Sequence, residues 1–254
     1  MTNPIFFGEP DAVRAAGVGS LFILEGPEAR HAVAVKRLGP GEPVDIVDGS
    51  GRRLTGTVTS AQPARLEVDV NAVEQEPEGR ERLILVQALA KGGRDEQAVE
   101  AATELGVDAV IPWQSERSIV RWRADKAAKG QAKWQGITAA AAKQSRRSRI
   151  PQVEAALETK ALGRRLADVD LVLVLHEEAD DSMVPAVLAA RDRTAGRPLS
   201  VAVVVGPEGG ISAAEVDLLR SGGAVAVRLG PHVLRSSTAG PAALALLNHA
   251  LGRW

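Results

Sequence analysis

The chain has 254 residues, a formal net charge of −1, no cysteine and four histidines, His31, His176, His232 and His249. This composition excludes disulfide scaffolds, thiolate metal sites and cysteine nucleophiles, and the histidines are too scattered in sequence to predict a metal cluster. No apolar run approaches the roughly 18 residues of a membrane span, and no secretion signal pattern opens the chain. We therefore expect a cytoplasmic protein with no metal and no membrane attachment.

The first 73 residues predict a small β domain, a barrel or a sandwich. Short β-like runs at residues 21–24, 43–47, 54–59 and 66–73 are separated by turns, without a long amphipathic helix. Asp48-Gly49-Ser50-Gly51 stands between two of these runs and is typical of a hairpin turn, because Asp and Gly tolerate left-handed backbone conformations. The polar segment 74–80, which contains Pro and Gly, predicts an interdomain linker.

Strands and helices alternate after this linker. Apolar runs predict strands at residues 83–89, 109–112, 171–175, 199–205 and 224–229. Helical spacing predicts helices at 95–105, 124–143, 182–192, 213–220 and 241–251, the last with Pro241 in its first turn. The alternation predicts an α/β domain whose parallel sheet is covered by helices on both faces.

Positive charge is concentrated in residues 112–165, which hold 13 basic and 4 acidic side chains. Such a block can attract a polyanion even when the whole protein is nearly neutral. A solvated, lysine-rich helical face explains the charge equally well, so both interpretations stay open at this point.

The most informative motif is Gly206-Pro207-Glu208-Gly209-Gly210-Ile211-Ser212, which follows the predicted strand 199–205. Its glycines permit positive φ angles and let a ligand approach the backbone without meeting a Cβ atom. Ser212 and Glu215 predict a capping box at the start of the next helix. A second glycine-bearing turn, residues 229–238, follows the next strand, so two ligand-facing turns are expected at neighbouring strand ends.

Two common nucleotide-binding motifs do not occur. No Gly-x-Gly-x-x-Gly follows the first strand of the large domain, and there is no Walker-type Gly-Lys-Ser/Thr. Dinucleotide and P-loop chemistry are therefore disfavoured. A turn that needs glycine only for its own backbone is the structural alternative for the motif taken alone.

Further short motifs are spread along the whole chain. They are His31, Arg37, 39–42 and 48–49 in the N-terminal part, 91–92, 103–107, Pro112, 115–118 and 144–151 in the middle, and 206–212, 229–231 and 233–235 in the C-terminal part. On these motifs the chain resembles the bacterial 16S ribosomal RNA uridine-N3 methyltransferases, a family of the SPOUT superfamily of S-adenosylmethionine enzymes. The C-terminal motifs are the most specific part of the resemblance.

The resemblance implies an architecture, a cofactor and partners. Residues 1–76 are expected to form a PUA-like RNA-binding β-barrel, and residues 77–254 a SPOUT methyltransferase domain with a C-terminal deep trefoil knot. The cofactor is S-adenosylmethionine, the substrate is 16S ribosomal RNA of the small subunit, and the protein is a homodimer. Periodicity alone would not predict a knot, because knots are rare exceptions to the usual connection rules.

The resemblance also implies site residues. For the cofactor these are Leu175, His176, Gly206, Glu208, Gly209, Gly210, Ile211, Leu229, Gly230, Val233, Leu234 and Ser236. For RNA they are His31, Arg37, Lys91, Arg117, Arg121, Arg123, Arg146, Arg147 and Arg149. Arginines can contact phosphates, and Trp113, Trp122 and Trp134 can stack on bases or pack in the core.

The implied reaction displaces a sulfonium methyl group by uracil N3, which requires alignment of the reacting atoms and loss of the imide proton. Arg235 is the first candidate for holding the uracil, because a guanidinium stays charged and offers several donors. Anchoring of the turn to a carboxylate such as Glu208 is the alternative role for Arg235. His232 is a second catalytic candidate, because imidazole can accept a proton near neutral pH.

The chain departs from the family pattern in three places. The chain has Ser236-Ser237-Thr238 where many relatives carry Thr-Glu-Thr. Because residue 237 is a serine here, no carboxylate at that position can act as the base. His232 replaces a frequent arginine, and Pro4-Ile5-Phe6-Phe7 lacks an arginine before the aromatic pair. Two rival functions remain: a non-catalytic RNA-binding ribosome-assembly factor of the same fold, and an α/β enzyme that uses another nucleotide.

Overall fold

The computed structural model describes residues 3–77, 79–194 and 196–254. The chain divides into two compact units, each described here by itself. The N-terminal unit consists of Met1–Glu78 together with Ala142–Ile150, and the larger unit consists of Gly79–Ala141 and Pro151–Trp254. Of the predicted linker 74–80, residue 78 lies outside the described residues.

The N-terminal unit is built on a mainly antiparallel sheet with the strand order β1-β3-β4-β5-β2. Its strands are β1 (Ile5–Phe7), β2 (Leu21–Glu25), β3 (Pro43–Val47), β4 (Arg52–Gln62) and β5 (Arg65–Gln75). The predicted β-like runs are confirmed. Sequence reasoning did not predict the short helices α1 (Pro10–Ala15) and α2 (Gly26–Arg30), nor the π-helical turn η1 (His31–Val35) that continues α2.

Alternation and turn chemistry explain this sheet. In β4 and β5, side chains of alternate residues such as Leu54 and Val58, or Leu66 and Val68, are buried in one core. The predicted hairpin turn joins β3 to β4, where Asp48 Oδ1 accepts the Ser50 amide at 2.7 Å and the Arg52 amide at 3.0 Å. The carboxylate thereby holds the turn closed.

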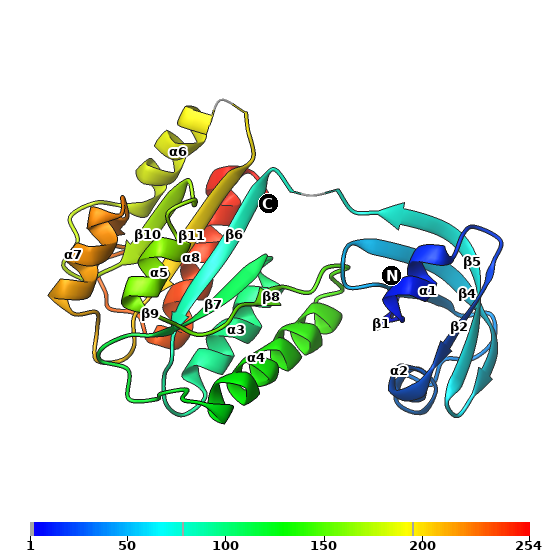
Figure 1. Ribbon diagram of the computed structural model, residues 1–254. Helices are drawn as coiled ribbons and strands as arrows, with labels where there is room; N and C mark the ends of the chain where they lie inside the picture. Colours follow the sequence, from blue (N-terminus) through cyan, green and yellow to red (C-terminus); the bar gives the residue numbers. More distant parts are fainter. Residues whose placement is uncertain (1–2, 78, 195) are drawn as a thin grey trace. The chain divides into compact units, whose positions relative to one another are not determined.

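The larger unit contains a parallel sheet with the order β12-β10-β11-β6-β7-β8, and β9 also pairs with β7 (Figure 1). Its strands are β6 (Glu81–Ala88), β7 (Ala109–Gln114), β8 (Gln152–Val153), β9 (Leu157–Glu158), β10 (Leu171–Leu175), β11 (Leu199–Val205) and β12 (Val225–Val227). Within the described residues every strand pair of this sheet is parallel, as the alternation predicts.

Helices cover both faces of this sheet. They are α3 (Arg94–Glu104), α4 (Asp125–Gln144), α5 (Thr159–Arg165), α6 (Met183–Thr194), α7 (Ala213–Ser221) and α8 (Ser236–Leu251). Helices α3, α4, α6 and α8 pack on one face with Leu83 and Leu85, and α5 and α7 pack on the other with Ile84 and Val86. The predicted α/β fold is confirmed. In the described residues no helix is both long enough and apolar enough to span a membrane.

The start of the last helix differs from the prediction. Helix α8 begins at Ser236, and Arg235 is its N-cap residue with an extended backbone. Pro241 therefore lies in the second turn and not in the first, and its missing amide leaves the carbonyl of Ser237 without the usual helical partner. Proline is a reliable mark of a first turn only when nothing upstream already starts the helix.

The strand order brings the site together. Strand β12 pairs with β10, and β10 pairs with β11, so the carboxyl ends Leu175, Val205 and Val227 lie at one edge of the sheet. Helix α8 then returns to pack against β6 and β11. Ligands of open α/β sheets bind at this edge.

Gly240→Ala is expected to lower the free energy of unfolding by about 1–3 kcal/mol, because overpacking forces filled neighbours to shift. A Cβ atom at Gly240 meets Leu85 Cδ1 at 2.8 Å and Val205 Cγ2 at 3.5 Å. The control is Gly136→Ala on α4, where a Cβ meets nothing within 4 Å and alanine raises helix stability by up to about 1 kcal/mol. Urea unfolding followed by circular dichroism measures both, and equal midpoints would contradict the close packing of α8 on the sheet.

Candidate functional site

A cavity of about 1040 Å³ lies at the carboxyl edge of the parallel sheet. Three chain segments line it: the end of β10 with residues 175–179, the glycine loop that follows β11, and the turn that follows β12. Helix α7 closes one side through Ala213, Val216 and Asp217. All these residues belong to the larger unit.

The structure brings the predicted cofactor residues together around this cavity. Leu175, His176, Gly206, Glu208, Gly209, Gly210, Ile211, Leu229, Gly230, Val233, Leu234 and Ser236 all line it, as do His232 and Arg235. Segments far apart in sequence therefore meet where the resemblance places a ligand. The binding and catalytic roles of these residues stay predictions.

Local packing fixes the glycine loop, residues 206–210. A Cβ atom at Gly206 would lie 2.6 Å from Ile211 Cγ1, so a larger residue would displace that side chain. Gly210 has a φ angle of 74°, in the left-handed region that glycine tolerates. The loop ends in the predicted capping box, which is confirmed: Ser212 Oγ accepts the Glu215 amide, and Glu215 Oε2 accepts the Ser212 amide.

The second turn presents exposed side chains to the cavity. His232, Val233, Leu234 and Arg235 are all exposed, Val233 by 74%. The carbonyl of Arg235 accepts the amides of Thr238 and Ala239 and so starts α8. The carboxylate of Glu208, the example named for an anchor of Arg235, pairs with Arg94 at 2.7 Å.

Charges around the cavity are mixed. Partial burial raises the pKa of Glu208, but the backbone amides of Glu208 and Lys91 and the Arg94 guanidinium outweigh this and hold that pKa below its usual value. His176 Nδ1 lies 3.3 Å from the backbone amide of Glu178 and can accept its hydrogen. One carboxylate of the cavity wall, that of Glu208, is thus paired with an arginine of the same wall.

Sequence reasoning missed several charged residues of the cavity wall, among them Arg94, Asp217 and Arg220. Asp217 and Arg220 belong to α7, which the sequence predicts, but the face that a helix turns to a cavity depends on tertiary packing. Arg94 could have been found from the sequence, because it follows Gly92-Gly93 in the loop between β6 and α3 and is the first residue of α3. Paired glycines between a strand and a helix mark the same edge of the sheet.

In the larger unit, several residues that are predicted to contact RNA form hydrogen bonds with the chain's own carbonyls. Arg117 Nη1 donates to the Gly209 carbonyl at 3.1 Å, and Arg121 donates to the carbonyls of Gln114 and Glu116. Lys91 and Arg123 are exposed. Because Arg121 is half-buried and donates to the chain's own carbonyls, it is a weaker candidate for a phosphate contact than its sequence position predicts.

The tryptophans serve mainly as core. Trp113 and Trp134 are 0% and 1% exposed, so stacking on a base is excluded for both in this conformation. Trp122 is half-buried and packs edge-on against Trp134, with ring centroids 5.1 Å apart. The core interpretation of these side chains is therefore confirmed for Trp113 and Trp134.

Within the N-terminal unit, His31 belongs to a small cluster of side chains. Its Nδ1 lies 2.8 Å from Lys143 Nζ, which also contacts Glu28 Oε2 at 2.7 Å and the Phe6 ring at 4.7 Å from the centroid. Burial, followed by the charge of Lys143, lowers the pKa of His31. The lowered pKa favours the neutral form of His31 at neutral pH. His31 lies in η1, and Arg37 follows it, outside the strands of the N-terminal sheet.

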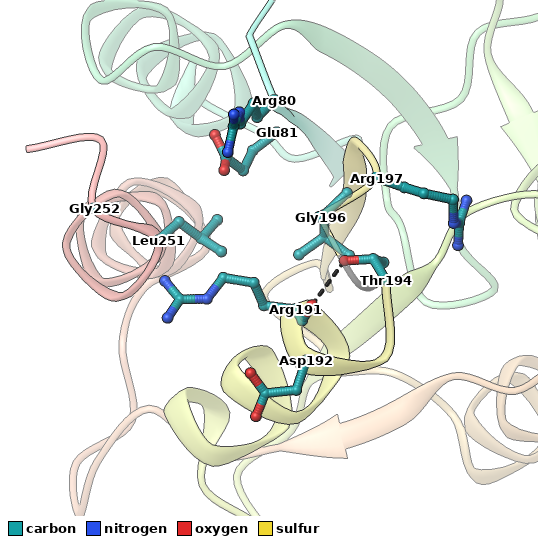
Figure 2. Close-up of a pocket in the computed structure, with 10 residues that line it drawn as sticks. Arg80, Glu81, Arg191, Asp192, Thr194, Gly196, Arg197, Leu251 and Gly252 are labelled. Atoms are coloured by element: carbon teal, nitrogen blue, oxygen red, sulfur yellow. Dashed lines mark hydrogen bonds between the residues drawn. The ribbon is translucent and has the colours of Figure 1, made fainter.

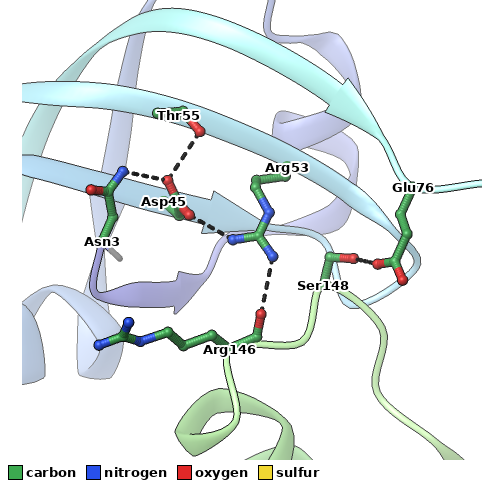
Figure 3. A network of polar contacts seen from close by, with 7 residues as sticks. All are labelled: Asn3, Asp45, Arg53, Thr55, Glu76, Arg146 and Ser148. Atoms are coloured by element: carbon green, nitrogen blue, oxygen red, sulfur yellow. Dashed lines mark hydrogen bonds and ion pairs between the residues drawn. The ribbon is translucent and has the colours of Figure 1, made fainter. Parts of the chain in front are cut away.

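The segment 142–150 is held on the N-terminal unit by polar contacts (Figure 3). Asp45 accepts hydrogen bonds from Asn3, Arg53 and Thr55, and the same Arg53 donates to the Arg146 carbonyl at 3.0 Å. Ser148 bonds to the Glu76 carboxylate.

The three predicted RNA-binding arginines of this segment lie in different environments. The guanidinium of Arg146 is exposed and points away from the network of Figure 3. Arg149 donates to the Glu76 carbonyl at 2.7 Å and lies against Gly51, and Arg147 is half-buried and engaged within the chain. Arg146 is the most accessible of the three.

A second cavity, of about 610 Å³, lies at the opposite edge of the parallel sheet (Figure 2). Its wall includes Glu81 and Leu199, the first residues of β6 and β11, and Leu251, the last residue of α8. None of the predicted site residues lines it. The predicted cofactor residues therefore line the larger cavity and not this one.

Comparison with known families decides the class of the protein. The family described as "RNA methyltransferase domain" matches residues 77–248, and the one described as "RNA methyltransferase PUA domain" matches residues 24–71. The chain belongs to this family of RNA methyltransferases. The first match includes every residue of the chain that lines the larger cavity.

Individual relatives agree with this RNA methyltransferase assignment. Ribosomal RNA small subunit methyltransferase E from Mycobacterium bovis is 40% identical over 240 residues, which cover 93% of this chain and 89% of that protein. The protein of the same name from Bacillus subtilis is 31% identical, with 90% of each chain covered. A crystal structure of this methyltransferase from Neisseria gonorrhoeae, bound to S-adenosyl methionine, has a TM-score of 0.82 at 27% identity and 98% coverage of each chain.

The described residues of this RNA methyltransferase offer no group of three or more His, Asp or Glu side chains that could hold a metal ion.

His31→Gln is expected to flatten the pH dependence of stability. The folded chain lowers the pKa of His31 from its usual value of 6.5, so the unfolded state binds more protons. The contribution of His31 to the free energy of unfolding is therefore fully present above the unfolded-state pKa of 6.5, and it is lost as the pH falls toward and through the lowered pKa of the folded chain. Urea unfolding followed by circular dichroism at several pH values between about 7.5 and 5.5 measures the effect. Identical pH profiles for the variant and the natural chain would contradict the lowered pKa.

Proposed function

We propose that the protein transfers a methyl group from S-adenosylmethionine to RNA of the small ribosomal subunit, at N3 of a uridine in 16S ribosomal RNA. The cavity where the glycine loop and the second turn meet carries this proposal. The relatives named ribosomal RNA small subunit methyltransferase E support it, and one of them binds S-adenosyl methionine in its crystal structure. Work on ribosomal RNA would place the protein in the cytoplasm.

The cavity residues fit this cofactor. A volume of about 1040 Å³ lies at the upper end of small-molecule sites, which measure roughly 300–1,000 Å³. Gly230 has open space where a Cβ would stand, so the backbone of the turn is accessible. Ser236 Oγ is buried in the cavity wall and has no hydrogen-bond partner in the described part of the chain. A buried polar atom of this kind is expected to bond a ligand or water.

The cavity is lined by both apolar and acidic side chains. Leu175, Ile211 and Leu229 supply apolar contacts, and the carboxylates of Glu177, Glu178 and Asp217 favour a positively charged ligand. When bound, S-adenosylmethionine supplies a methyl group activated by the positive sulfur. The protein's own contribution is then to hold uracil N3 in line with that methyl group and to exclude other nucleophiles.

Arg235 is the residue we propose for holding the uracil. It is exposed, lines the cavity and stands at the N-cap of α8, where its backbone is fixed by the first turn. A guanidinium there can donate to a uracil carbonyl oxygen and stabilise the negative charge that grows on it when N3 loses its proton. His232, three residues earlier on the same turn, is the second candidate and would accept that proton.

We also propose the remaining architecture that the resemblance implies. The chain after β11 would form the trefoil knot, which the placement of β12 beyond β10 and the return of α8 to β11 support. The N-terminal unit would be the PUA-like barrel that binds RNA, supported by the match over residues 24–71 and by the exposed Arg37 and Arg146. A homodimer would cover exposed apolar side chains such as Leu188 and Leu246 on the contacting helices α6 and α8.

Two measurements test the function. Calorimetric titration of S-adenosylmethionine into the protein should give saturable binding. Nucleoside mass spectrometry should find 3-methyluridine in 16S ribosomal RNA from cells that carry the protein and none from cells that lack it. Binding without a change in 3-methyluridine would favour another target or a non-catalytic assembly factor, and no binding would refute the methyltransferase proposal.

Gly230→Leu should weaken binding of S-adenosylmethionine at least about tenfold, because the added side chain enters space that the ligand needs. The matched control is Gly17→Leu in the N-terminal unit, since a Cβ at either glycine meets nothing within 4 Å. Calorimetry gives the affinities and thermal unfolding confirms that both variants fold. Equal affinities for the two variants would place the cofactor elsewhere.

Arg235→Ala should reduce kcat about 100-fold or more, because the loss of one preorganised donor to a developing oxyanion has effects of that order. The dissociation constant for S-adenosylmethionine should change far less. Single-turnover methylation and calorimetry measure the two quantities. Equal losses in both would indicate that Arg235 only shapes the turn.

A further inference from the structure

Two arginines from outside the glycine loop contact it. Arg94 Nη1 lies 2.7 Å from Glu208 Oε1, and Arg117 Nη1 donates to the Gly209 carbonyl at 3.1 Å. Arg94 is the first residue of α3, and Arg117 follows β7. Both arginines line the larger cavity. The loop is thus tied to two neighbouring segments of the sheet edge.

Glu208 is the point where these ties converge. Its carboxylate accepts the Arg94 guanidinium and the backbone amide of Lys91, and its side chain is 24% exposed. The lowered pKa keeps it ionised at neutral pH. The segment that leads from β6 to α3 contains Gly92 and Gly93, both with positive φ angles, and this sharp path brings Arg94 within reach of Glu208.

The far side of the loop is also fastened. Glu215, 5% exposed, uses Oε2 for the capping box, while its Oε1 accepts the Glu116 amide at 2.8 Å and the Thr159 hydroxyl at 2.6 Å. A Cβ at Gly209 would lie 3.3 Å from Arg117 Cβ, so the loop lies directly against the 115–117 segment. The stretch between Glu208 and Glu215 therefore has a fixed partner at each end.

A loop with glycines at 206, 209 and 210 has a high conformational entropy when it is free. If ligand binding had to order such a loop, the ordering would reduce the affinity, whereas a loop that is already ordered binds without that loss. An exposed ion pair contributes little to global stability, with a median near 0–1 kcal/mol. The consequence of the Arg94 contact is therefore local.

On the function proposed above, we propose that Arg94 is a positioning residue that acts through Glu208: it holds the glycine loop in the conformation that binds S-adenosylmethionine. Arg94 sets the affinity for the cofactor through this loop and does not touch the ligand or the reacting atoms. Arg117 supports the same loop through the Gly209 carbonyl.

The test combines four variants, Arg94→Lys among them, with a matched control. Arg94→Gln, Glu208→Gln and the double variant remove the ion pair from either side. The control, Arg165→Gln, breaks the Arg165–Glu154 pair of the same unit, whose side chains are similarly exposed at 33% and 18%. Calorimetry gives the dissociation constant for S-adenosylmethionine, steady-state methylation separates KM from kcat, and hydrogen–deuterium exchange of residues 206–211 without ligand reports on the loop.

Arg94→Gln should weaken cofactor binding about tenfold, raise the cofactor KM more than it lowers kcat, and speed exchange in residues 206–211. The double variant should bind no more weakly than the weaker single variant, because both changes remove the same contact. Arg94→Lys should restore part of the affinity. Arg165→Gln should behave like the natural chain.

Several results would overturn the proposal. One is an affinity of Arg94→Gln for S-adenosylmethionine equal to that of Arg165→Gln. Another is an additive loss of affinity in the double variant, which would mean that Arg94 contacts the ligand directly. A third is a raised KM for RNA alone, which would mean a phosphate contact. If the natural chain binds no S-adenosylmethionine, the proposed function fails, and unchanged exchange in Arg94→Gln would separately refute the positioning role.

Discussion

The parallel pairing of β12 with β10 is the contact on which the site depends. Three residues of β12 pair with Leu173, Val174 and Leu175, and this short ladder places the second turn beside the glycine loop. A strand of three residues has little stability of its own. Its position is maintained by burial of Val227 and by the helices α7 and α8 that precede and follow it. The site is thus assembled by tertiary packing of the last part of the chain.

Positive charge in this protein has two uses that composition does not separate. Arg121 and Arg149 are half-buried and donate to carbonyls of the chain, and Arg117 donates to a carbonyl while it stays exposed, as Arg123 and Arg146 do. Some of the basic residues in 112–165 therefore also have a structural use. The same division holds at the cavity, where Arg94 is paired and Arg235 lies exposed at the N-cap of α8.

Features encoded by short-range sequence could be predicted well. The Asp48 hairpin turn, the Ser212–Glu215 capping box and the strand and helix order of the large unit depend on neighbouring residues and on periodicity. The two turns of the cavity were recognised by their glycines and by resemblance. Their meeting in space required the strand order, which local pattern does not specify.

Features decided by distant contacts could not be predicted. The start of α8 at Ser236, the low pKa of His31 beside Lys143 and the pairing of Arg94 with Glu208 each join segments that are separated in sequence or depend on packing. The burial of Trp113 and Trp134 is of the same kind, because a tryptophan in a basic stretch carries no local sign of which side it faces.

The N-terminal unit includes Ala142–Ile150, a segment that is synthesised well after the rest of that unit. A ribosome releases the chain from its N-terminus, so the small unit lacks its last segment until the first strands and helices of the large unit have also been synthesised. In an isolated fragment of residues 1–77, Arg53 would lack the Arg146 carbonyl and Glu76 would lack Ser148 as hydrogen-bond partners. The contacts of this segment with the N-terminal unit can therefore form only after part of the larger unit has been synthesised.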